Sequence, residues 1–193
     1  MVFNKNIKIL AFVGMAGSGK TTAVNYLAEK GFPKIYSGGM LFDEMEKSGI
    51  ELTPENQRSF REQIRRERGD DYIARLCAEQ IHNLINAGQK QLVLDGPYTW
   101  PEYRFLKTEF PGAITVVAVV APRKVRHKRL SGRPDRPFSE LQSQQRDQSE
   151  IEGIEKAGPI AMADYYIDSQ GDLDDFYTKI DEVTEQLRFL HNT

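Results

Sequence analysis

The chain has 193 residues, a formal net charge of −2, 39% hydrophobic residues and 28% charged residues, which suits one globular domain with a full hydrophobic core. No apolar run approaches the ~20 residues that a membrane helix needs, and no signal-peptide pattern is visible, so we expect a soluble, cytoplasmic protein without a membrane partner. The mildly acidic balance also argues against a dedicated nucleic-acid partner.

The N-terminal half alternates strand and helix patterns. Residues 8–14 contain an uninterrupted apolar run from Ile9 to Val13, typical of a strand buried on both faces. Thr53 stands before Pro54 as an N-cap residue stands before the first helical position. Cys77, the single cysteine, falls among apolar residues of helical period, which indicates a buried thiol. These patterns predict strands over 8–14, 33–38 and 91–96, and helices over 23–31, 40–48, 53–69 and 73–88.

The C-terminal half continues the alternation, with strands over 113–121 and 164–169 and helices entered at 99–102 and running over 122–130, 139–156 and 176–190. Uninterrupted apolar strands alternating with helices predict a three-layer α/β/α fold around a five-stranded parallel sheet. We expect a single domain over 1–193. Within it, residues 38–70 form a helical insertion on the ligand-binding face and residues 130–138 form a short lid.

The first strand leads directly into "GMAGSGKT", residues 14–21, which satisfies the pattern G-x-x-x-x-G-K-[ST]. Glycines let backbone N–H groups surround a phosphate at a helix N-terminus, so the sequence predicts a phosphate-binding loop, or P-loop. The Lys20 ammonium is placed to reach the β- and γ-phosphates of ATP, and the Thr21 hydroxyl to bind Mg²⁺. The predicted nucleotide site consists of Gly14, Ala16, Gly17, Ser18, Gly19, Lys20, Thr21 and Thr22.

An acid follows another buried strand in "LVLDG", residues 92–96. At the carboxyl end of a parallel strand Asp95 is placed to hold Mg²⁺ or its water, or to polarise an acceptor hydroxyl. A simple turn or helix cap before Pro97 is the alternative.

Arginines are concentrated where a migrating phosphoryl group needs charge compensation. Arg126 and Arg129 lie three apart on one helical face, and Arg133 and Arg136 lie in a loop bounded by glycine and proline. Any one of them alone can be solvated surface. As a group they predict a lid that closes over the phosphates.

With these residues in view, the sequence resembles the nucleoside monophosphate kinase and dephospho-CoA kinase branch of P-loop kinases. It is similar to the small adenylate-kinase-related proteins, best known from archaea, in "GMAGSGKT", "TPEN" at 53–56, "LVLDG" and "AMADYYID" at 161–168. The resemblance implies that residues 14–22 hold ATP phosphates, that Asp95 lies near acceptor and metal, and that Arg129 and Arg133 engage the transferring phosphates. It also implies that Arg65 grips the acceptor's phosphate and that Arg146 corresponds to an arginine of a late helix.

The chain departs from this pattern on the acceptor side. "YSGGMLFDE" places Met40 where adenylate kinases have an acid and Asp43 where they have a phosphate-gripping arginine, and Tyr98 lies near another expected arginine. Either Arg58, Arg61 or Arg65 takes over, or the acceptor is not an ordinary monophosphate. The predicted acceptor site consists of Ser37, Arg61, Arg65, Asp95, Gly96, Tyr98, Arg136 and Arg146.

The leading hypothesis is an ATP-dependent kinase that transfers the γ-phosphoryl group to a small nucleotide-like acceptor. The acceptor is either a nucleoside monophosphate or a dephospho-CoA-like molecule. The predicted catalytic residues are Lys20, Asp95, Arg129 and Arg133. The alternative is a nucleotide-dependent switch or regulatory ATPase, and a kinase acting on nucleic-acid ends is the third. Aromatic residues at 98, 100 and 103 either stack on an acceptor base or serve packing. The three histidines show no metal-ligand spacing. The sequence leaves open the acceptor, ATP or GTP as donor, and a monomer or homodimer.

Overall fold

The computed structural model describes residues 6–134 and 137–189, apart from the side chains of residues 54, 55 and 58. A five-stranded parallel sheet forms its centre, in the order β2-β3-β1-β4-β5. The central strand β1 is paired on both sides, with Leu10 opposite Val93 of β3 and Thr115 of β4. The predicted five-stranded parallel sheet is therefore confirmed. Its strands are β1 Lys8–Val13, β2 Lys34–Tyr36, β3 Gln91–Asp95, β4 Ile114–Val120 and β5 Tyr165–Asp168.

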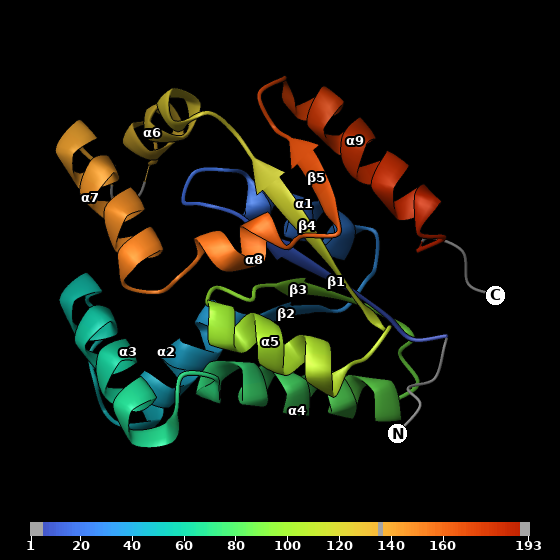
Figure 1. Cartoon of the computed structure of the whole chain (residues 1–193), viewed down its shortest axis with the longest axis horizontal. Coiled ribbons are helices and arrows are strands. Elements are labelled where there is room, and N and C mark those ends of the chain that lie inside the picture. The colour runs from blue at the N-terminus through green and yellow to red at the C-terminus, as the bar shows by residue number, and fades with distance from the viewer. Residues whose placement is uncertain (1–5, 135–136, 190–193) are drawn as a thin grey trace.

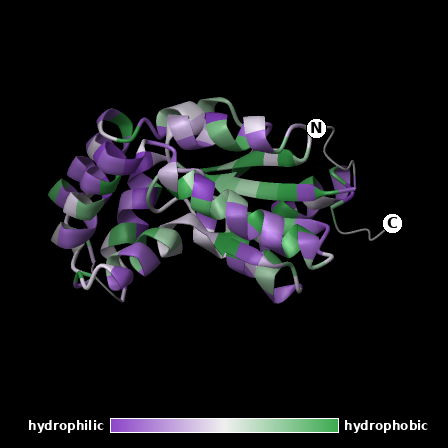
Figure 2. Cartoon of the chain, turned by 90° about the horizontal axis from the view of Figure 1, so that it is seen from below, coloured by the Kyte–Doolittle hydropathy of each residue, from purple (hydrophilic) through white to green (hydrophobic). Residues whose placement is uncertain are grey.

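Helices cover both faces of the sheet, as Figure 1 shows. Side chains alternate along β1, so Ile9, Ala11 and Val13 pack on one face, and Leu10 and Phe12 on the other. The first face is covered by α2 Ser37–Lys47, α4 Tyr72–Asn86 and α5 Trp100–Glu109, and the second by α1 Lys20–Glu29 and α9 Leu173–Gln186. Figure 2 shows hydrophobic strands enclosed by helices of mixed polarity, which is the pattern of a buried parallel sheet.

The remaining helices are α3 Pro54–Arg68, α6 Arg123–Ser131, α7 Glu140–Glu152 and α8 Ala157–Ala161. Figure 1 shows α3, α6 and α7 on one side of the molecule, with α6 leaving the carboxyl end of β4. The predicted cap of α3 is confirmed, because Thr53 Oγ1 accepts a hydrogen bond from the Asn56 amide at 3.2 Å. Ser139 and Gln142 form a capping box that fixes the start of α7.

Three predicted boundaries were wrong. The helix expected over 139–156 ends at Glu152, because the chain turns at Gly153 and passes through a left-handed residue, Glu155 (φ 52°), before α8 begins. The second strand is only three residues long, and Ser37 already begins α2. The last helix ends at Gln186, although Phe189 still packs into the core. In the part of the chain that the structure describes, no helix has the length and apolar character to cross a membrane.

Candidate nucleotide and acceptor site

The glycine-rich loop after β1 is held in a shape that side chains would prevent. Gly14, Gly17 and Gly19 have φ values of 152°, 78° and 103°. A Cβ on Gly14 would lie 2.4 Å from the Val119 carbonyl oxygen, and one on Gly17 would lie 2.7 Å from the Arg126 carbonyl oxygen. Both glycines are therefore needed for close approach to β4 and α6.

The loop ends at α1, which begins at Lys20 without a side-chain cap. The first N–H groups of this helix have no intrahelical acceptor and carry the positive end of the helix dipole. Ser18 is buried, and its hydroxyl has no hydrogen-bond partner among the described residues. The geometry fits a phosphate at the start of α1, which is the role predicted for residues 14–22.

Lys20 and Thr21 meet Asp95 at the carboxyl end of β3. The Lys20 ammonium lies 3.6 Å from Asp95 Oδ1, and the Thr21 hydroxyl donates to Asp95 Oδ2 at 3.2 Å. The Tyr98 hydroxyl donates to Oδ1 at 2.9 Å. Burial raises the pKa of Tyr98 well above its usual value, and the Asp95 charge adds to this, so the phenol stays a proton donor. Side chains from the start of α1 and from the segment after β3 therefore orient one buried carboxylate.

The oxygen atoms of Thr21 and Asp95 suit magnesium. Mg²⁺ prefers hard oxygen ligands and, in nucleotide sites, one or two protein ligands with waters and phosphates completing its shell. No group of three or more His, Cys, Asp or Glu residues that could hold a metal occurs among the described residues. The donor set therefore fits a metal that arrives with a nucleotide.

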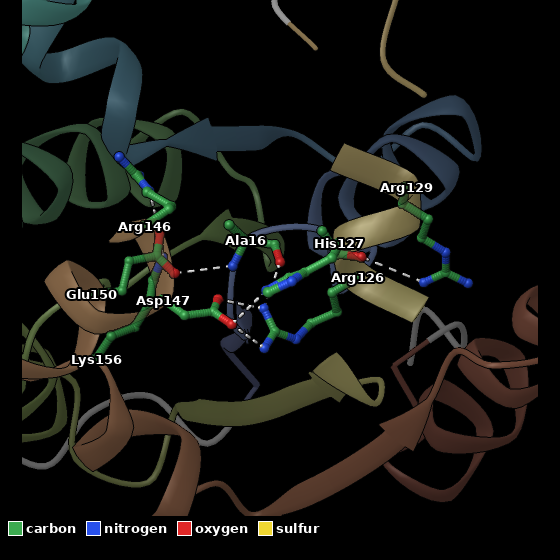
Figure 3. Close-up of polar contacts among 9 residues, drawn as sticks. Ala16, Arg126, His127, Arg129, Arg146, Asp147, Glu150 and Lys156 are labelled. Carbon is green, nitrogen blue, oxygen red and sulfur yellow. Dashed lines mark hydrogen bonds and ion pairs between the residues drawn. The ribbon is translucent and has the colours of Figure 1, made fainter. Parts of the chain in front are cut away.

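Arg126 and Asp147 support the loop from behind, as Figure 3 shows. Arg126 donates to both oxygens of Asp147 at 2.6 and 2.8 Å and to the Ala16 carbonyl oxygen at 3.0 Å. His127 Nε2 lies 2.9 Å from Asp147 Oδ2. Burial alone would raise the pKa of Asp147, but hydrogen bonds from Arg126 and His127 hold it below its usual value. Arg126, predicted as part of the phosphate-facing group, is engaged in this buried ion pair instead.

Arg129 links the loop to the end of β5. Its guanidinium donates to the Ser169 hydroxyl at 2.9 Å and also to the Ser169 carbonyl oxygen. Ser169 in turn donates to the Ser18 carbonyl oxygen at 2.6 Å. Arg129 therefore lies at the loop, and its contact with the transferring phosphates stays a prediction. Arg133 is exposed, and Arg136 lies outside the described residues.

Three arginines predicted for the acceptor come together from two helices that lie far apart in the sequence. Arg61 and Arg65 come from α3, and Arg146 comes from α7. Arg65 lies 3.9 Å from Glu102 Oε1, and Arg146 Nε donates to Glu150 Oε1 at 3.0 Å. Burial lowers the pKa of Arg61, and the charges of Arg146 and Arg65 lower it further. Guanidinium groups that repel one another in a partly buried site favour an anion among them.

Ser37 and Gly96, both predicted for the acceptor site, lie against each other after β2 and β3. Ser37 is buried, and its hydroxyl accepts from the Cys77 thiol at 3.4 Å. A Cβ on Gly96 (φ 147°) would lie 2.3 Å from the Ser37 Oγ. The predicted burial of Cys77 is confirmed, and burial raises the pKa of its thiol to about 12. Asp43 is exposed on α2, while Met40 packs against the core.

Of the aromatic residues after β3, Trp100 and Tyr103 pack together, whereas Tyr98 contacts Asp95. Trp100 stacks on Tyr103 with ring centroids 5.1 Å apart, and a Cβ on Gly158 of α8 would lie 2.9 Å from the indole. Trp100 therefore serves packing between α5 and α8. Tyr98 alone of these three points its hydroxyl at Asp95.

Four functional-site residues were missed by the sequence reasoning. Glu102 is buried, accepts from the Tyr98 amide at 2.8 Å, and has a pKa that burial raises. The sequence did contain a pattern that marks Glu102, since Thr99-x-x-Glu102 is the pattern of a capping box. Glu150 and Lys156 lie in a segment whose polar composition suggested only a solvated helix. Ser169 is an uncharged residue at the end of a predicted strand, so its side chain gave no functional signal. Their contacts arise only from the fold.

Comparison with known proteins places the chain in a family. A family model described as an AAA domain matches residues 10–152. A UPF0200 protein of Thermococcus onnurineus is 33% identical over 187 residues, which cover 95% of this chain and 100% of that protein. A UPF0200 protein of Sulfurisphaera tokodaii is 33% identical over 185 residues, covering 94% and 98%.

Solved structures share the fold at lower identity. Shikimate kinase from Acinetobacter baumannii in complex with shikimate superposes with a TM-score of 0.60 at 20% identity, over 95% of each chain. Dephospho-CoA kinase from Campylobacter jejuni gives a TM-score of 0.54 at 15% identity, over 94% of this chain and 98% of that one. At such identity the likeness shows the fold alone. The chain therefore belongs to the UPF0200 family and carries an AAA domain with a P-loop kinase-like fold.

Proposed function

We propose that the protein is an ATP-dependent phosphotransferase that moves the γ-phosphoryl group to a small nucleotide-like acceptor. The observation that carries the proposal is the convergence of Lys20 and Thr21, at the start of α1, on Asp95 at the end of β3. This arrangement places an ammonium, a hydroxyl and a carboxylate beside the uncapped helix end where a triphosphate would lie. The kinase-like structural neighbours are consistent with this chemistry.

The acceptor in this proposal carries an anionic group, such as the phosphate of a nucleoside monophosphate or of a dephospho-CoA-like molecule. Arg61, Arg65 and Arg146 would bind it in place of the arginine that is missing at Asp43. Residues 38–70 would then act as the acceptor-binding insertion, and residues 130–138, which carry Arg133 and Arg136, as the lid of a single kinase domain.

When bound, Mg²⁺ would supply positive charge that offsets the negative charge developing on the phosphates. Thr21 and Asp95 would hold it, directly or through water. Lys20 would contact the β- and γ-phosphates, and Arg129 and Arg133 would compensate the charge of the migrating group. Catalysis of this kind is mostly positioning and electrostatic stabilisation.

The experiment that tests the proposal is a turnover screen. MgATP would be incubated with the nucleoside and deoxynucleoside monophosphates and dephospho-CoA, and products would be identified by mass spectrometry. A phosphorylated acceptor is expected, and Lys20→Ala should lower kcat by roughly 10²-fold or more. A Lys20→Ala enzyme with near-normal kcat would overturn the assignment.

A nucleotide-dependent switch or regulatory ATPase is the second candidate, favoured by the exposed acid Asp43 and the phenol Tyr98 at positions where related kinases have arginines. Under this hypothesis MgATP is hydrolysed at a rate that no acceptor changes. Product formation from an acceptor separates the two.

A further inference from the structure

Lys156 is a buried lysine that the proposed function does not use. It immediately precedes α8, and its residue is only 5% exposed. Its ammonium lies 2.7 Å from Glu150 Oε1, and Glu150 itself is 1% exposed. The chain turns sharply to place it there, since Glu155 is left-handed and the Lys156 amide donates to the Glu150 carbonyl oxygen at 3.0 Å. Burying a lysine is costly, so an ion pair of this kind is weak evidence of a purely stabilising role.

The carboxylate that binds Lys156 also touches the P-loop. Glu150 Oε2 accepts a hydrogen bond from the Ala16 amide at 3.0 Å, while Oε1 accepts from Arg146. Figure 3 shows Glu150 between Ala16, Arg146 and Lys156. A single carboxylate therefore separates the Lys156 ammonium from the backbone of the phosphate loop.

The Tyr98 ring lies near both Lys156 and Lys20, one of the residues proposed to bind ATP. The Lys156 ammonium lies 5.2 Å from the centroid of the Tyr98 ring, and the Lys20 ammonium lies 5.3 Å from the same centroid. The hydroxyl of this ring donates to Asp95. Lys156 thus lies at the same aromatic ring as the lysine expected to bind the β- and γ-phosphates.

The charges around this point are not balanced by the described residues. The cations Lys20, Arg61, Arg65, Arg146 and Lys156 outnumber the carboxylates Asp95, Glu102 and Glu150. An excess of positive charge in a partly buried cluster favours binding of a polyanion. Lysine suits such a role because its flexible stem and three N–H donors let it keep one partner and gain another.

We propose that Lys156 is a second phosphate-binding lysine, which contacts the γ-phosphate of bound ATP while Glu150 holds it in reach of the P-loop. This inference rests on the proposed function, because it assumes that a nucleoside triphosphate occupies the loop. Glu150, with Arg146 as its other partner, positions the ammonium and the Ala16 amide together. Lys156 then distinguishes ATP from ADP, since only ATP carries the phosphate that it contacts.

The protonation of Lys156 supports this role and supplies an independent readout. Burial lowers its pKa to about 8, the Glu150 charge opposes this, and the charges of Lys20 and Arg146 lower it further. The charged groups that act on its pKa therefore come from α7 and α1, and the Tyr98 ring lies against the ammonium. A γ-phosphate beside the ammonium would raise its pKa, so ATP binding near pH 8 should take up about half a proton.

The first experiment compares variants by calorimetry, using the magnesium complex of a non-hydrolysable ATP analogue and ADP as probes. Lys156→Gln should lower affinity for the ATP analogue about tenfold or more and leave ADP affinity nearly unchanged. Lys107→Gln is the matched control, because Lys107 also pairs with an acid, Asp164, but lies on α5 away from the loop. Thermal unfolding verifies that each variant is folded.

The second experiment repeats the titration of the wild-type protein near pH 8 in buffers of different ionisation enthalpy. Proton uptake is expected with the ATP analogue and not with ADP. Lys156→Arg should keep the preference for the ATP analogue and lose the uptake, because a guanidinium does not titrate in this range. This variant also covers the case in which Lys156→Gln fails to fold.

The outcomes distinguish the two proposals. Wild-type protein that binds neither nucleotide overturns the proposed function. Wild-type protein that binds both, with an ATP preference that Lys156→Gln and Lys156→Arg leave intact and with no proton uptake, overturns the role of Lys156 while the proposed function stands.

Discussion

At the scale of single residues, Tyr98 lies near a position where the related kinases carry an arginine, and it makes different contacts. Its hydroxyl orients Asp95, and its ring lies near two ammonium groups. A phenol supplies a hydrogen bond and a π face but no positive charge, so its contribution is to position other groups.

Tyr98→Phe keeps the ring and removes the donor to Asp95. We expect kcat to fall about tenfold or more, as for the loss of one hydrogen bond to a charged group, with KM for ATP nearly unchanged. Steady-state kinetics on the acceptor found in the screen measure this. Tyr103→Phe is the control, because that hydroxyl bonds the Met162 carbonyl oxygen instead. A kcat equal to that of the wild type would exclude a positioning role for the hydroxyl.

Arg61 tests the acceptor side. Its guanidinium is drawn toward an anion by the repulsion of Arg65 and Arg146, so Arg61→Gln should raise KM for the acceptor about tenfold or more and leave KM for ATP unchanged. Arg66→Gln on the same helix is the matched control, because Arg66 is exposed. Equal effects of the two substitutions would contradict an acceptor site at Arg61.

The residue scale is also where sequence reasoning reached its limit. The glycine pattern and Asp95 were identified because their chemistry is written in consecutive letters after apolar strands. Lys156, Glu150 and Ser169 were not identified, since their contacts depend on how α7, α8 and the end of β5 return to the loop. Long-range contacts of this kind have no local pattern.

At the scale of elements, α3 depends on one cap. The Thr53 side chain satisfies the Asn56 amide, and the helix that it begins carries Arg61 and Arg65 into the site. The Thr53 cap therefore helps to fix the helix that carries two arginines of the proposed acceptor site.

Thr53→Ala should lower the free energy of unfolding by about 1 kcal/mol, as for loss of an N-cap. Urea unfolding measures this change, with Thr108→Ala as the control because that exposed hydroxyl bonds within α5. Destabilisation by Thr53→Ala no greater than that of the control would show that the cap contributes nothing.

Element boundaries were predicted well where capping chemistry marked them and poorly elsewhere. The start of α3 had Thr53 and Pro54, whereas the turn after α7 has only Gly153 and a left-handed Glu155, which no propensity indicates. The polar run over 139–156 continued the helical pattern, so the break that brings Lys156 inward was not visible in the sequence.

At the scale of the whole molecule, burial of Lys156 makes stability depend on pH. Its folded pKa of about 8 lies below the ordinary 10.5, so the unfolded chain holds more protons between these values. Stability therefore rises with pH across this window.

From about pH 7 to about pH 9.5 we expect Lys156 to add about 1–2 kcal/mol to the free energy of unfolding. Urea unfolding at several pH values measures this, and Lys156→Gln should remove the rise. Above this range Tyr98 acts in the opposite direction, because its raised pKa favours the folded state only while the phenol is protonated in it. A rise of equal size in Lys156→Gln would assign the effect to other groups.

The sheet order also sets when the nucleotide site is completed during synthesis. β1 comes first in the chain, yet its neighbours are β3 and β4, and the loop that follows it is held by Arg126, Glu150 and Ser169. A nascent chain that ends before Ser169 therefore lacks part of this scaffold. Bound nucleotide would therefore stabilise only the folding steps that follow the synthesis of Ser169.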